Sequence, residues 1–272
     1  MARIPADRLQ GVPETMLPVL YARAYESRRS DGIIHDPVAL QWVERIAYDF
    51  SRFEDTPITH FGVAVRTEIL DELAGAYLQR HPDAVIVNVG AGLDTRCFRL
   101  NNGQRLWVEL DLPESLAVRR QLVSEDARYR LLAYSALDVD HWRAELPAGR
   151  PLLFIVEGLL MYFSGDEVRN WLSQIAEHFP GAHLLCEVMG VGQAERTHLN
   201  DAISKTSAQF RWGIREAAQM ADWHPRLRYL TDISIYDRHE DRWRALPIPF
   251  RQSLVTYRNS VNRIVHLQVD PA

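Results

Sequence analysis

The segment VIVNVGAGLD at residues 85–94 constrains the fold of this chain more than any other part of its sequence. Residues 85–89 form a continuous apolar-rich run, as expected of a strand that is buried on both faces of a sheet. Gly90 and Gly92 follow, and glycine lets the backbone approach a ligand closely, while the N-terminus of a following helix attracts polar or anionic groups. A tight strand-to-helix turn without a ligand would need such glycines too. The segment therefore predicts a strand, a turn and a helix, and leaves open whether a nucleotide binds there.

Short apolar runs and helical stretches alternate after this segment. The further strand-like runs lie at residues 105–110, 129–134, 152–156, 183–188, 228–234 and 264–269. Helical stretches lie between them at residues 113–125, 140–145 and 165–178. This alternation implies a parallel sheet with right-handed crossovers, and the last two runs indicate a closing hairpin. The sequence thus predicts an α/β fold with a Rossmann-like, seven-stranded sheet and a long, mostly polar helical insertion at 190–225 before the hairpin.

The residues before the first strand have a helical pattern. Residues 21–28 and 63–78 carry apolar side chains at helix-like spacing. Asp36, followed by a proline, can start a helix as its N-cap. We therefore divide the chain into an N-terminal helical cap, residues 1–82, and a Rossmann-like core, residues 83–272, with the insertion as a lid.

Polar side chains end several of the predicted strands. Asp111 follows the glycines by about 20 residues, where nucleotide-binding α/β domains place an acid on the ribose hydroxyls. Residues 135–138 and Glu157 follow two further strands. Each of them alone would be an ordinary solvated residue at a strand end. Because ligands of such sheets lie outside the carboxyl ends of the strands, their convergence predicts a nucleotide-type cofactor site.

The glycine block distinguishes between two enzyme classes that use this turn. Dehydrogenases carry Gly-x-Gly-x-x-Gly, whose third glycine permits close packing of the helix. Thr95 occupies that third position here, and no Tyr-x-x-x-Lys pair follows. The seven-strand pattern also favours an S-adenosylmethionine-dependent methyltransferase. An NAD-dependent oxidoreductase and a non-catalytic nucleotide-binding module are the alternatives.

Composition and charge argue against several other classes. The net charge of −5 gives no reason to expect a nucleic-acid partner. The ten histidines are scattered without metal-type spacing, so no metal is expected. The two cysteines fit a reduced, cytoplasmic protein, and no apolar run has the length of a signal peptide core or of a membrane span.

Several motifs closely resemble the leucine carboxyl methyltransferase family, in its bacterial, tetracenomycin polyketide O-methyltransferase-like branch. The motifs that carry this resemblance are ETMLPVLYARAYES at 14–27, HDP at 35–37, VRT at 65–67, VNVGAGLDTR at 87–96, WVELDLP at 107–113, EGLLMY at 157–162 and FRWGI at 210–214. They span nearly the whole chain in the family's order. The glycine block with Asp94, Thr95 and Arg96 is the most specific of them.

The resemblance implies a class I S-adenosylmethionine-dependent methyltransferase fold and assigns roles to single residues. Arg66 would pair with the methionine carboxylate of the cofactor, and Arg23 would also reach it. Gly90 would contact the methionine or ribose portion, Asp111 the ribose diol, and Glu157 the methionine amino group.

The adenine contacts are the point where this sequence departs from the family. The family often has Asp-Leu after the third strand, but Ser135 and Ala136 stand there, with Asp138 nearby. The cofactor-binding residues implied by the resemblance are Arg23, Arg66, Gly90, Ala91, Gly92, Asp94, Asp111, Leu112, Ser135, Ala136, Leu137, Asp138, Glu157 and Gly158.

The expected reaction is O-methylation of a small natural product at a polyketide-type carboxyl or hydroxyl group. A carboxylate needs no general base, whereas a phenol with a pKa near 10 would benefit from one. Tyr162 and His198 are the candidate catalytic residues, with His60 as a further possibility, although lone histidines are mostly structural. The candidate acceptor pocket comprises Tyr21, Tyr25, Phe61, Met161, Phe210, Trp212 and Arg215, with Arg211 as an alternative to Arg215. A protein C-terminal carboxylate is the alternative acceptor, and we expect a monomer or homodimer without nucleic-acid or membrane partners.

Overall fold

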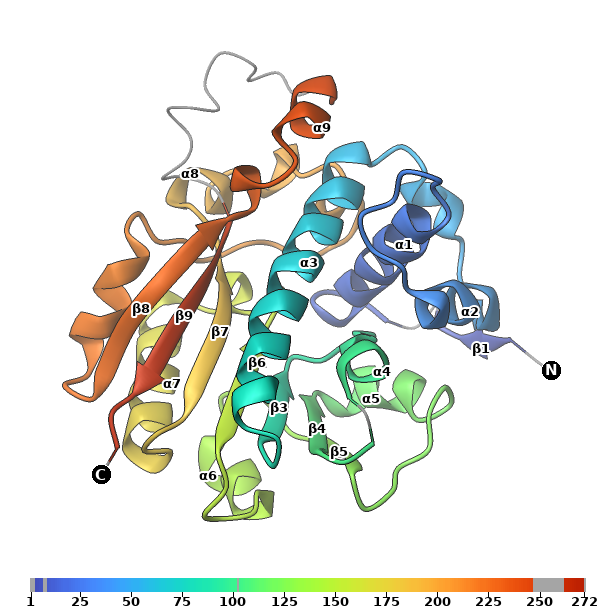
Figure 1. The fold of residues 1–272 in the computed structure, drawn as a ribbon. Helices are drawn as coiled ribbons and strands as arrows, with labels where there is room; N and C mark the ends of the chain where they lie inside the picture. The colour runs from blue at the N-terminus through green and yellow to red at the C-terminus, as the bar shows by residue number, and fades with distance from the viewer. Residues whose placement is uncertain (1–2, 7–8, 102, 247–261, 272) are drawn as a thin grey trace.

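The computed structural model describes residues 3–6, 9–101, 103–246 and 262–271. A mixed seven-stranded sheet of order β5-β4-β3-β6-β7-β9-β8 forms its centre (Figure 1). The strands are β3 (Val85–Val89), β4 (Leu106–Asp111), β5 (Tyr129–Ala133), β6 (Leu152–Val156), β7 (His183–Val188), β8 (Leu227–Ser234) and β9 (Arg263–Val269). All seven predicted strands are confirmed, with ends that differ by at most one residue.

The pairing of the strands creates a switch point at β3. The chain runs from β3 outward to β4 and β5, and then returns to place β6 on the other side of β3. All of these neighbours are parallel, whereas β9 is antiparallel to both β7 and β8. Ligands of doubly wound sheets bind at the carboxyl edge where the strand order reverses.

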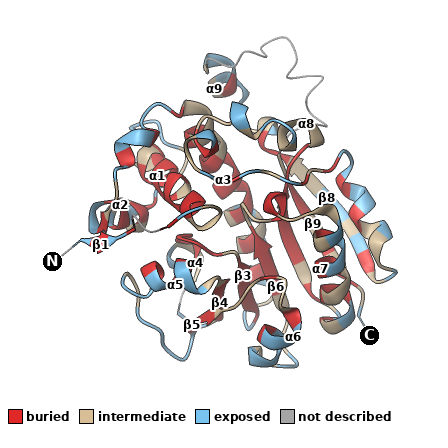
Figure 2. Cartoon of the chain, turned by 180° about the vertical axis from the view of Figure 1, so that it is seen from behind, coloured by how far each residue is buried: buried red, intermediate tan, exposed pale blue. Residues whose placement is uncertain are grey.

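Helices cover both faces of the sheet, as the buried strands in Figure 2 show. Because side chains alternate along a strand, Val85, Val87 and Val89 pack with α6 (Val139–Trp142) and α7 (Gly165–His178) on one face. Ile86 packs on the other face with α3 (Pro57–Arg80), α4 (Arg96–Leu100) and α5 (Pro113–Arg119). The proposed cap, residues 1–82, therefore contains one helix, α3, that covers the sheet itself.

The remaining N-terminal elements form a separate apolar cluster beside the carboxyl edge. They are α1 (Met16–Ser27), α2 (Pro37–Arg45) and a small parallel pair, β1 (Ile4–Pro5) with β2 (Ile46–Ala47). The sequence pattern missed this strand pair, because two residues are too few for a period-2 signal. Asp36 is the predicted N-cap of α2, and its carboxylate accepts a hydrogen bond from Ala39 N at 2.8 Å.

The prediction of a long helical insertion at 190–225 is wrong. The segment contains α8 (Val191–Ala194) and short 3-10 turns at 197–199, 203–205 and 217–223. Asn200 Oδ1 accepts hydrogen bonds from Ala202 N and Ile203 N, which favours a turn over a continuous helix. A Cβ on Gly213 would lie 2.8 Å from the carbonyl oxygen of Gly190, so two loop backbones pack against each other here.

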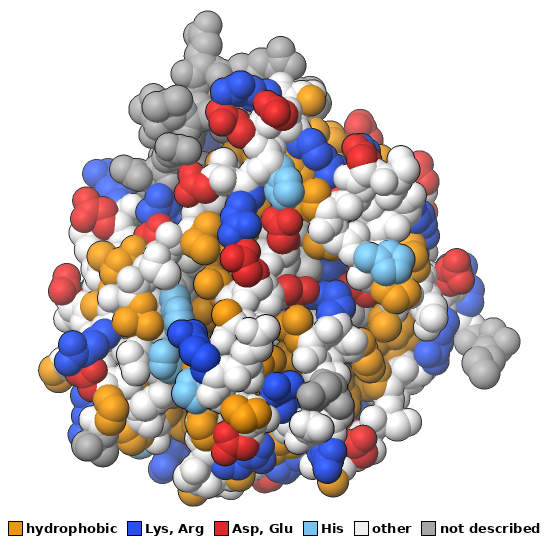
Figure 3. Space-filling model, in the orientation of Figure 1, with side chains coloured by type: hydrophobic (Ala, Val, Ile, Leu, Met, Phe, Trp, Pro, Cys, Tyr) orange, Lys and Arg blue, Asp and Glu red, His pale blue; other side chains and the backbone are white. Residues whose placement is uncertain are grey.

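Two further features differ from the sequence pattern. Helix α5 ends at Arg119 and not at residue 125. A helix that the sequence pattern did not predict, α9 (Glu240–Ala245), lies in the long connection between β8 and β9. Within the described residues, no helix combines the length and apolarity that crossing a lipid bilayer requires. On the face that carries α3, acidic and basic side chains lie interspersed (Figure 3).

Candidate functional site

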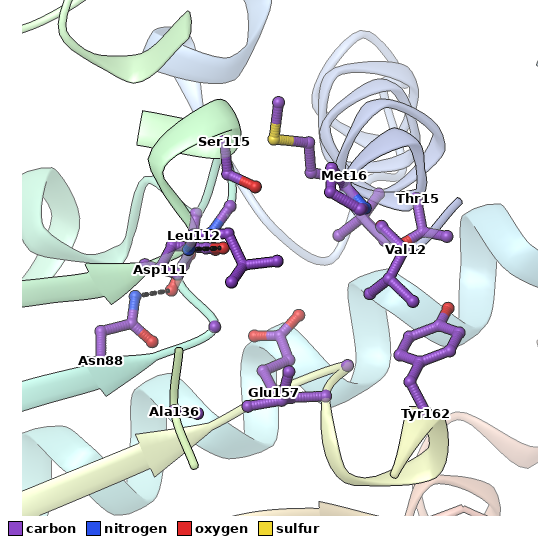
Figure 4. Close-up of a pocket in the computed structure, with 18 of the residues that line it drawn as sticks. Val12, Thr15, Met16, Asn88, Asp111, Leu112, Ser115, Ala136, Glu157 and Tyr162 are labelled. Carbon is purple, nitrogen blue, oxygen red and sulfur yellow. Dashed lines mark hydrogen bonds between the residues drawn. The ribbon is translucent and has the colours of Figure 1, made fainter. Parts of the chain in front are cut away.

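A cavity of about 330 Å³ lies at the carboxyl edge of the sheet, next to the switch point. Figure 4 shows Asp111, Leu112 and Ala136 on its sheet side, and Met16 and Tyr162 facing them from α1 and from the turn after β6. The predicted residues that line it are Arg23, Arg66, Gly90, Ala91, Gly92, Asp94, Asp111, Leu112, Ser135, Ala136, Leu137, Glu157, Gly158 and Tyr162. The fold therefore brings together nearly all of the residues assigned to the cofactor.

The glycine turn after β3 has a conformation that favours glycine at both positions. Gly90 and Gly92 have φ angles of 68° and 47°. A Cβ on Gly90 would lie 2.9 Å from Leu159 Cδ2, and one on Gly92 would lie 2.9 Å from Met16 Cβ. Both glycines are thus needed for the turn and its packing, whether or not a ligand is present.

Asp111 at the end of β4 closes one side of the cavity. Its carboxylate accepts hydrogen bonds of 2.6 Å from Gly92 N and from Leu112 N. Burial raises the pKa of this carboxyl group, and the two amides act against that rise. The Ser115 side chain is a third hydrogen-bond partner of this carboxylate. Because an ionised carboxylate has about four acceptor positions, Asp111 can still receive a hydrogen bond from a ribose diol.

Arg66 on α3 is held by two carboxylates. Its Nε donates to Glu157 Oε1 at 2.9 Å, and its Nη1 donates to both oxygens of Glu187 at 3.0 and 3.1 Å. Burial alone would raise the pKa of Glu157, but the positive charges of Arg66 and Arg96 outweigh burial and lower it. Sequence analysis missed Glu187, whose position at the end of β7 was the available signal. The charge of Arg66 is thus already compensated within the protein.

Arg23 on α1 is the less satisfied arginine of the cavity. Its side chain is 1% exposed, and its Nη2 donates to Leu93 O at 2.7 Å. The nearest carboxylates, of Asp36 and Glu157, lie at 3.7 and 3.8 Å, and among the described residues the buried Nε finds no hydrogen-bond partner. Burial lowers the pKa of Arg23 despite these carboxylates. An unsatisfied buried donor costs about 1–3 kcal/mol, so a ligand carboxylate beside Arg23 would relieve a real deficit.

The motif Asp94-Thr95-Arg96 forms a buried network below the turn. Arg96 is fully buried and donates to Asp71, Asp94 and Glu157 at 2.5–2.6 Å. Burial would raise the pKa of Asp94, but the positive charges of Arg96, Arg23 and Arg99 outweigh burial and hold it below its usual range. Thr95 Oγ1 donates to the carboxylate of Asp36, the N-cap of α2. This motif thus connects the glycine turn to α2 and α3. The charges of Asp94 and Arg96 are paired within the protein and stabilise this connection.

Some predicted residues lie outside this cavity. Asp138 is half-exposed and hydrogen-bonded to His141 at 2.6 Å, because the α6 turn directs it to the surface. Phe61 packs against Trp243, with ring centroids 4.6 Å apart. Trp212 packs against Trp223 in the core below α7. None of these side chains is available to a ligand in the cavity.

The expected aromatic pocket of the cap is also absent from the cavity lining. Tyr21 stacks on Phe50 at 5.7 Å, and Tyr25 stacks on His60 at 4.1 Å. These rings pack against one another among the N-terminal elements, so their role in the structure is packing. Met161 is buried behind Tyr162, and Arg215 is exposed without lining the cavity.

The end of the cavity opposite Asp111 is formed by residues of three segments. Tyr162 lies here, and burial raises the pKa of its hydroxyl to about 12. Arg211 lines the cavity beside Glu167, with Nη1 3.5 Å from its carboxylate. Val12 and Thr15 contribute from the N-terminal segment. Thr15 lies in the motif at 14–27 that resembles the family, but sequence analysis assigned neither residue to the site. Within the described residues, no group of His, Cys, Asp or Glu is arranged to hold a metal ion.

His198 and Phe210 line a second hollow that is formed by the insertion. His198 therefore lies outside the cavity that contains the glycine turn, although it had been considered for catalysis.

Comparison with known proteins supports the assignment of this cavity as a cofactor site. The profile of the leucine carboxyl methyltransferase family matches residues 17–176. The tetracenomycin polyketide synthesis O-methyltransferase of Streptomyces glaucescens is 31% identical over 244 residues, covering 89% of this chain and 86% of that protein. An S-adenosyl-L-methionine-dependent methyltransferase of Gibberella zeae is 30% identical and covers 81% of each chain. The crystal structure of a DUF574 family protein from Streptomyces avermitilis shares the fold, with a TM-score of 0.58 and 13% identity over 92% of this chain and 97% of that one.

The residues present fit the cofactor that this family uses. The buried Arg23 offers an unsatisfied donor to a carboxylate, and Asp111 offers a free acceptor position to a diol. The match to this family argues against the alternative that the protein is an NAD-dependent oxidoreductase. The chain belongs to the leucine carboxyl methyltransferase family and is an S-adenosylmethionine-dependent methyltransferase.

Proposed function

We propose that the protein methylates a carboxyl oxygen of a small, ring-bearing natural product. The observation that carries this proposal is the state of the ionisable groups around the cavity. Glu157 and Asp94 are paired with arginines, and Glu167 accepts hydrogen bonds in the capping box of α7. Tyr162, with its raised pKa, keeps its proton at neutral pH. Among the described lining residues, a general base for a phenol is thus missing, whereas a carboxylate acceptor needs none.

The family description and one relative support the same acceptor class. The matched family is named for a carboxyl group, and the Streptomyces glaucescens relative for polyketide synthesis. Arg211 at the mouth of the cavity supplies a positive charge that can attract an acidic acceptor.

In this proposal the chain mainly positions two reactants. The bound cofactor supplies an electrophilic methyl group. Asp111 holds the ribose hydroxyls, Arg23 holds the methionine carboxylate, and Glu157 receives the amino group. Tyr162 and Thr15 border the space in which the acceptor carboxylate approaches. Alignment of two reactants within one cavity removes much of the entropic barrier to an in-line transfer.

Methyl-labelled S-adenosylmethionine tests the acceptor class with naphthoic acid and naphthol, which share a ring system and differ in the acceptor group. We expect label in naphthoic acid as a base-labile methyl ester, and none in naphthol. Base-stable label in naphthol would show hydroxyl methylation, and label only at protein C-termini would favour the alternative acceptor. Arg211→Ala should raise KM for the acid, with the exposed Arg215→Ala as the matched control.

A further inference from the structure

Three consecutive carbonyl oxygens of the glycine turn, beginning with that of Gly92, are held by two buried arginines. Arg119 on α5 donates from Nη1 to Gly92 O at 2.8 Å and from Nη2 to Asp94 O at 2.7 Å. Arg23 on α1 donates to Leu93 O, which lies between them in the chain, at 2.7 Å. This stretch of backbone is therefore fixed from two helices that are distant in sequence.

Arg119 differs from Arg23 in its position relative to the cofactor cavity. It is fully buried and is not among the residues that line the cavity. Its Nη2 also donates to the carboxylate of Glu109 at 2.5 Å, and its Nε donates to the hydroxyl of Tyr129 at 2.9 Å. With the two carbonyl oxygens, these partners occupy four of the roughly five N–H groups of a guanidinium. Any effect of Arg119 on a ligand is therefore exerted through the turn.

The strands below the turn hold the partner of Arg119 in place. Glu109 on β4 is fully buried, and its other oxygen accepts from Asn88 Nδ2 at 2.8 Å. Asn88 ends one residue before the end of β3 and donates also to the carboxylate of Asp94 at 3.0 Å. A buried ion pair is often no more stabilising than apolar side chains of the same volume. We therefore expect the pair of Glu109 and Arg119 to contribute mainly to the conformation of the turn.

The turn is the part of the cofactor site whose backbone most needs such support. Gly90 and Gly92 give it a freedom that other residues do not have. Gly92 N donates to the carboxylate of Asp111 at 2.6 Å, and Gly92 O accepts from Arg119, so both backbone polar groups of this residue are anchored. Asp111 is also the residue that we assign to the ribose. A site that is ordered before the ligand arrives binds it at a lower entropic cost.

We propose that Arg119 is a positioning residue for the cofactor, which keeps the glycine turn in its binding conformation before S-adenosylmethionine binds. It acts through Gly92 O and Asp94 O and does not contact the ligand. This role concerns the cofactor alone, so it does not depend on which acceptor is methylated.

Arg119→Lys separates positioning from stability. Lysine keeps a positive charge for Glu109, but its ammonium group lacks the planar fork that spans two carbonyl oxygens. We expect the Kd for S-adenosylhomocysteine in calorimetry to rise about tenfold, as when about one free molecule in ten keeps the binding conformation. Tyr129→Phe removes one partner of Arg119 and keeps the ring, so it should raise Kd in the same direction, by about twofold. Urea denaturation confirms that each variant is folded at the assay temperature.

Arg45→Lys is the matched control. Arg45 also donates to two neighbouring carbonyl oxygens, those of Gln121 and Leu122, but it is exposed and lies outside the cavity. We expect its variant to bind S-adenosylhomocysteine as tightly as the wild type does.

Hydrogen exchange, followed by mass spectrometry of a peptide that covers the turn, tests the same role in the cofactor-free protein. The amides of Gly92 and Asp94 donate to Asp111 and to Ala91 O. We expect both amides to exchange slowly in the wild type without cofactor, and faster in Arg119→Lys. Saturation with S-adenosylhomocysteine should restore slow exchange in the variant.

Unchanged affinity in both Arg119→Lys and Tyr129→Phe would overturn the proposal, even if the urea midpoint of Arg119→Lys were lower. An equal loss of affinity in Arg45→Lys, or rapid exchange of the turn in the cofactor-free wild type, would also overturn it. If Arg119→Lys does not fold, Tyr129→Phe and the exchange of the wild type decide the question.

Discussion

The glycine turn and the insertion both contribute residues to the lining of the cofactor cavity, but they are held in place in different ways. The turn is fixed by buried ion pairs, with Arg96 in contact with three carboxylates. The insertion is attached by apolar packing, with Trp212 in the main core, and its residues 201–207 by hydrogen bonds nearer the surface, such as those from Ile58 N to Asp201 and from Gly11 N to Ser207. A cofactor is the same in every turnover and suits a rigid site.

Arg96→Ala tests the rigid side and should have the largest effect. The substitution leaves three carboxylates without their buried cation, so we expect a loss of about 3–5 kcal/mol in unfolding free energy. Urea denaturation measures it, with the exposed Arg244→Ala as control. A wild-type midpoint for Arg96→Ala would show that the network does not stabilise the turn.

Arg23→Met should weaken cofactor binding by about 1.5–3 kcal/mol, the worth of hydrogen bonds to a charged group. Calorimetry with S-adenosylhomocysteine measures this loss, and Arg23→Lys, which keeps the charge, should lose less. If Arg66→Met weakened binding more than Arg23→Met at equal stability, Arg66 would be the carboxylate partner instead.

Asp111→Ala should cost about 1–3 kcal/mol of cofactor affinity, because the diol loses its acceptor. Asp138→Ala is the matched control, since Asp138 lies at the surface outside the cavity. Equal losses in the two variants would contradict the site derived from the structure.

Asp201→Ala tests the attachment of the insertion. Thr56, the N-cap of α3, forms no side-chain cap bond, and Asp201 accepts from Ile58 N and Thr59 N in its place. We expect a loss of about 0.5–2 kcal/mol in stability, as for other helix caps, with weaker acceptor binding and unchanged cofactor affinity. The exposed Asp222→Ala serves as control. Loss of cofactor affinity in Asp201→Ala would erase the distinction between the two regions.

The smallest effect is expected at the opposite edge of the sheet, away from both regions. Burial, followed by the charges of His266, His81 and Arg80, lowers the pKa of His183 to about 4. Since an unfolded histidine titrates near 6.5, the unfolded state binds more protons between these values. Stability should therefore fall as pH decreases from about 6.5 to 4. His183→Gln should reduce this slope in thermal unfolding scans, whereas the exposed His35→Gln should not; identical slopes would refute the assignment.

The sequence by itself determined the sheet and the cofactor edge. Continuous apolar runs such as residues 85–89 have one stable place, a strand covered on both faces, and the glycines require the turn that follows. Strand ends then meet at one edge of a parallel sheet, so Asp111 and Glu157 converge without knowledge of side-chain packing.

Only the tertiary structure decided how the charged groups are shared and how the insertion folds. Glu187 compensates Arg66 from 121 residues away and leaves Arg23 with the open donor. Asp201 caps a helix that starts more than 140 residues earlier. The insertion has no periodic apolar pattern, so its turns depend on contacts with distant backbone, such as Gly190 against Gly213. The periodicity of apolar residues indicates only which residues close together in the chain share a face. Partners that are distant in sequence, such as Glu187 for Arg66, are determined by the tertiary structure.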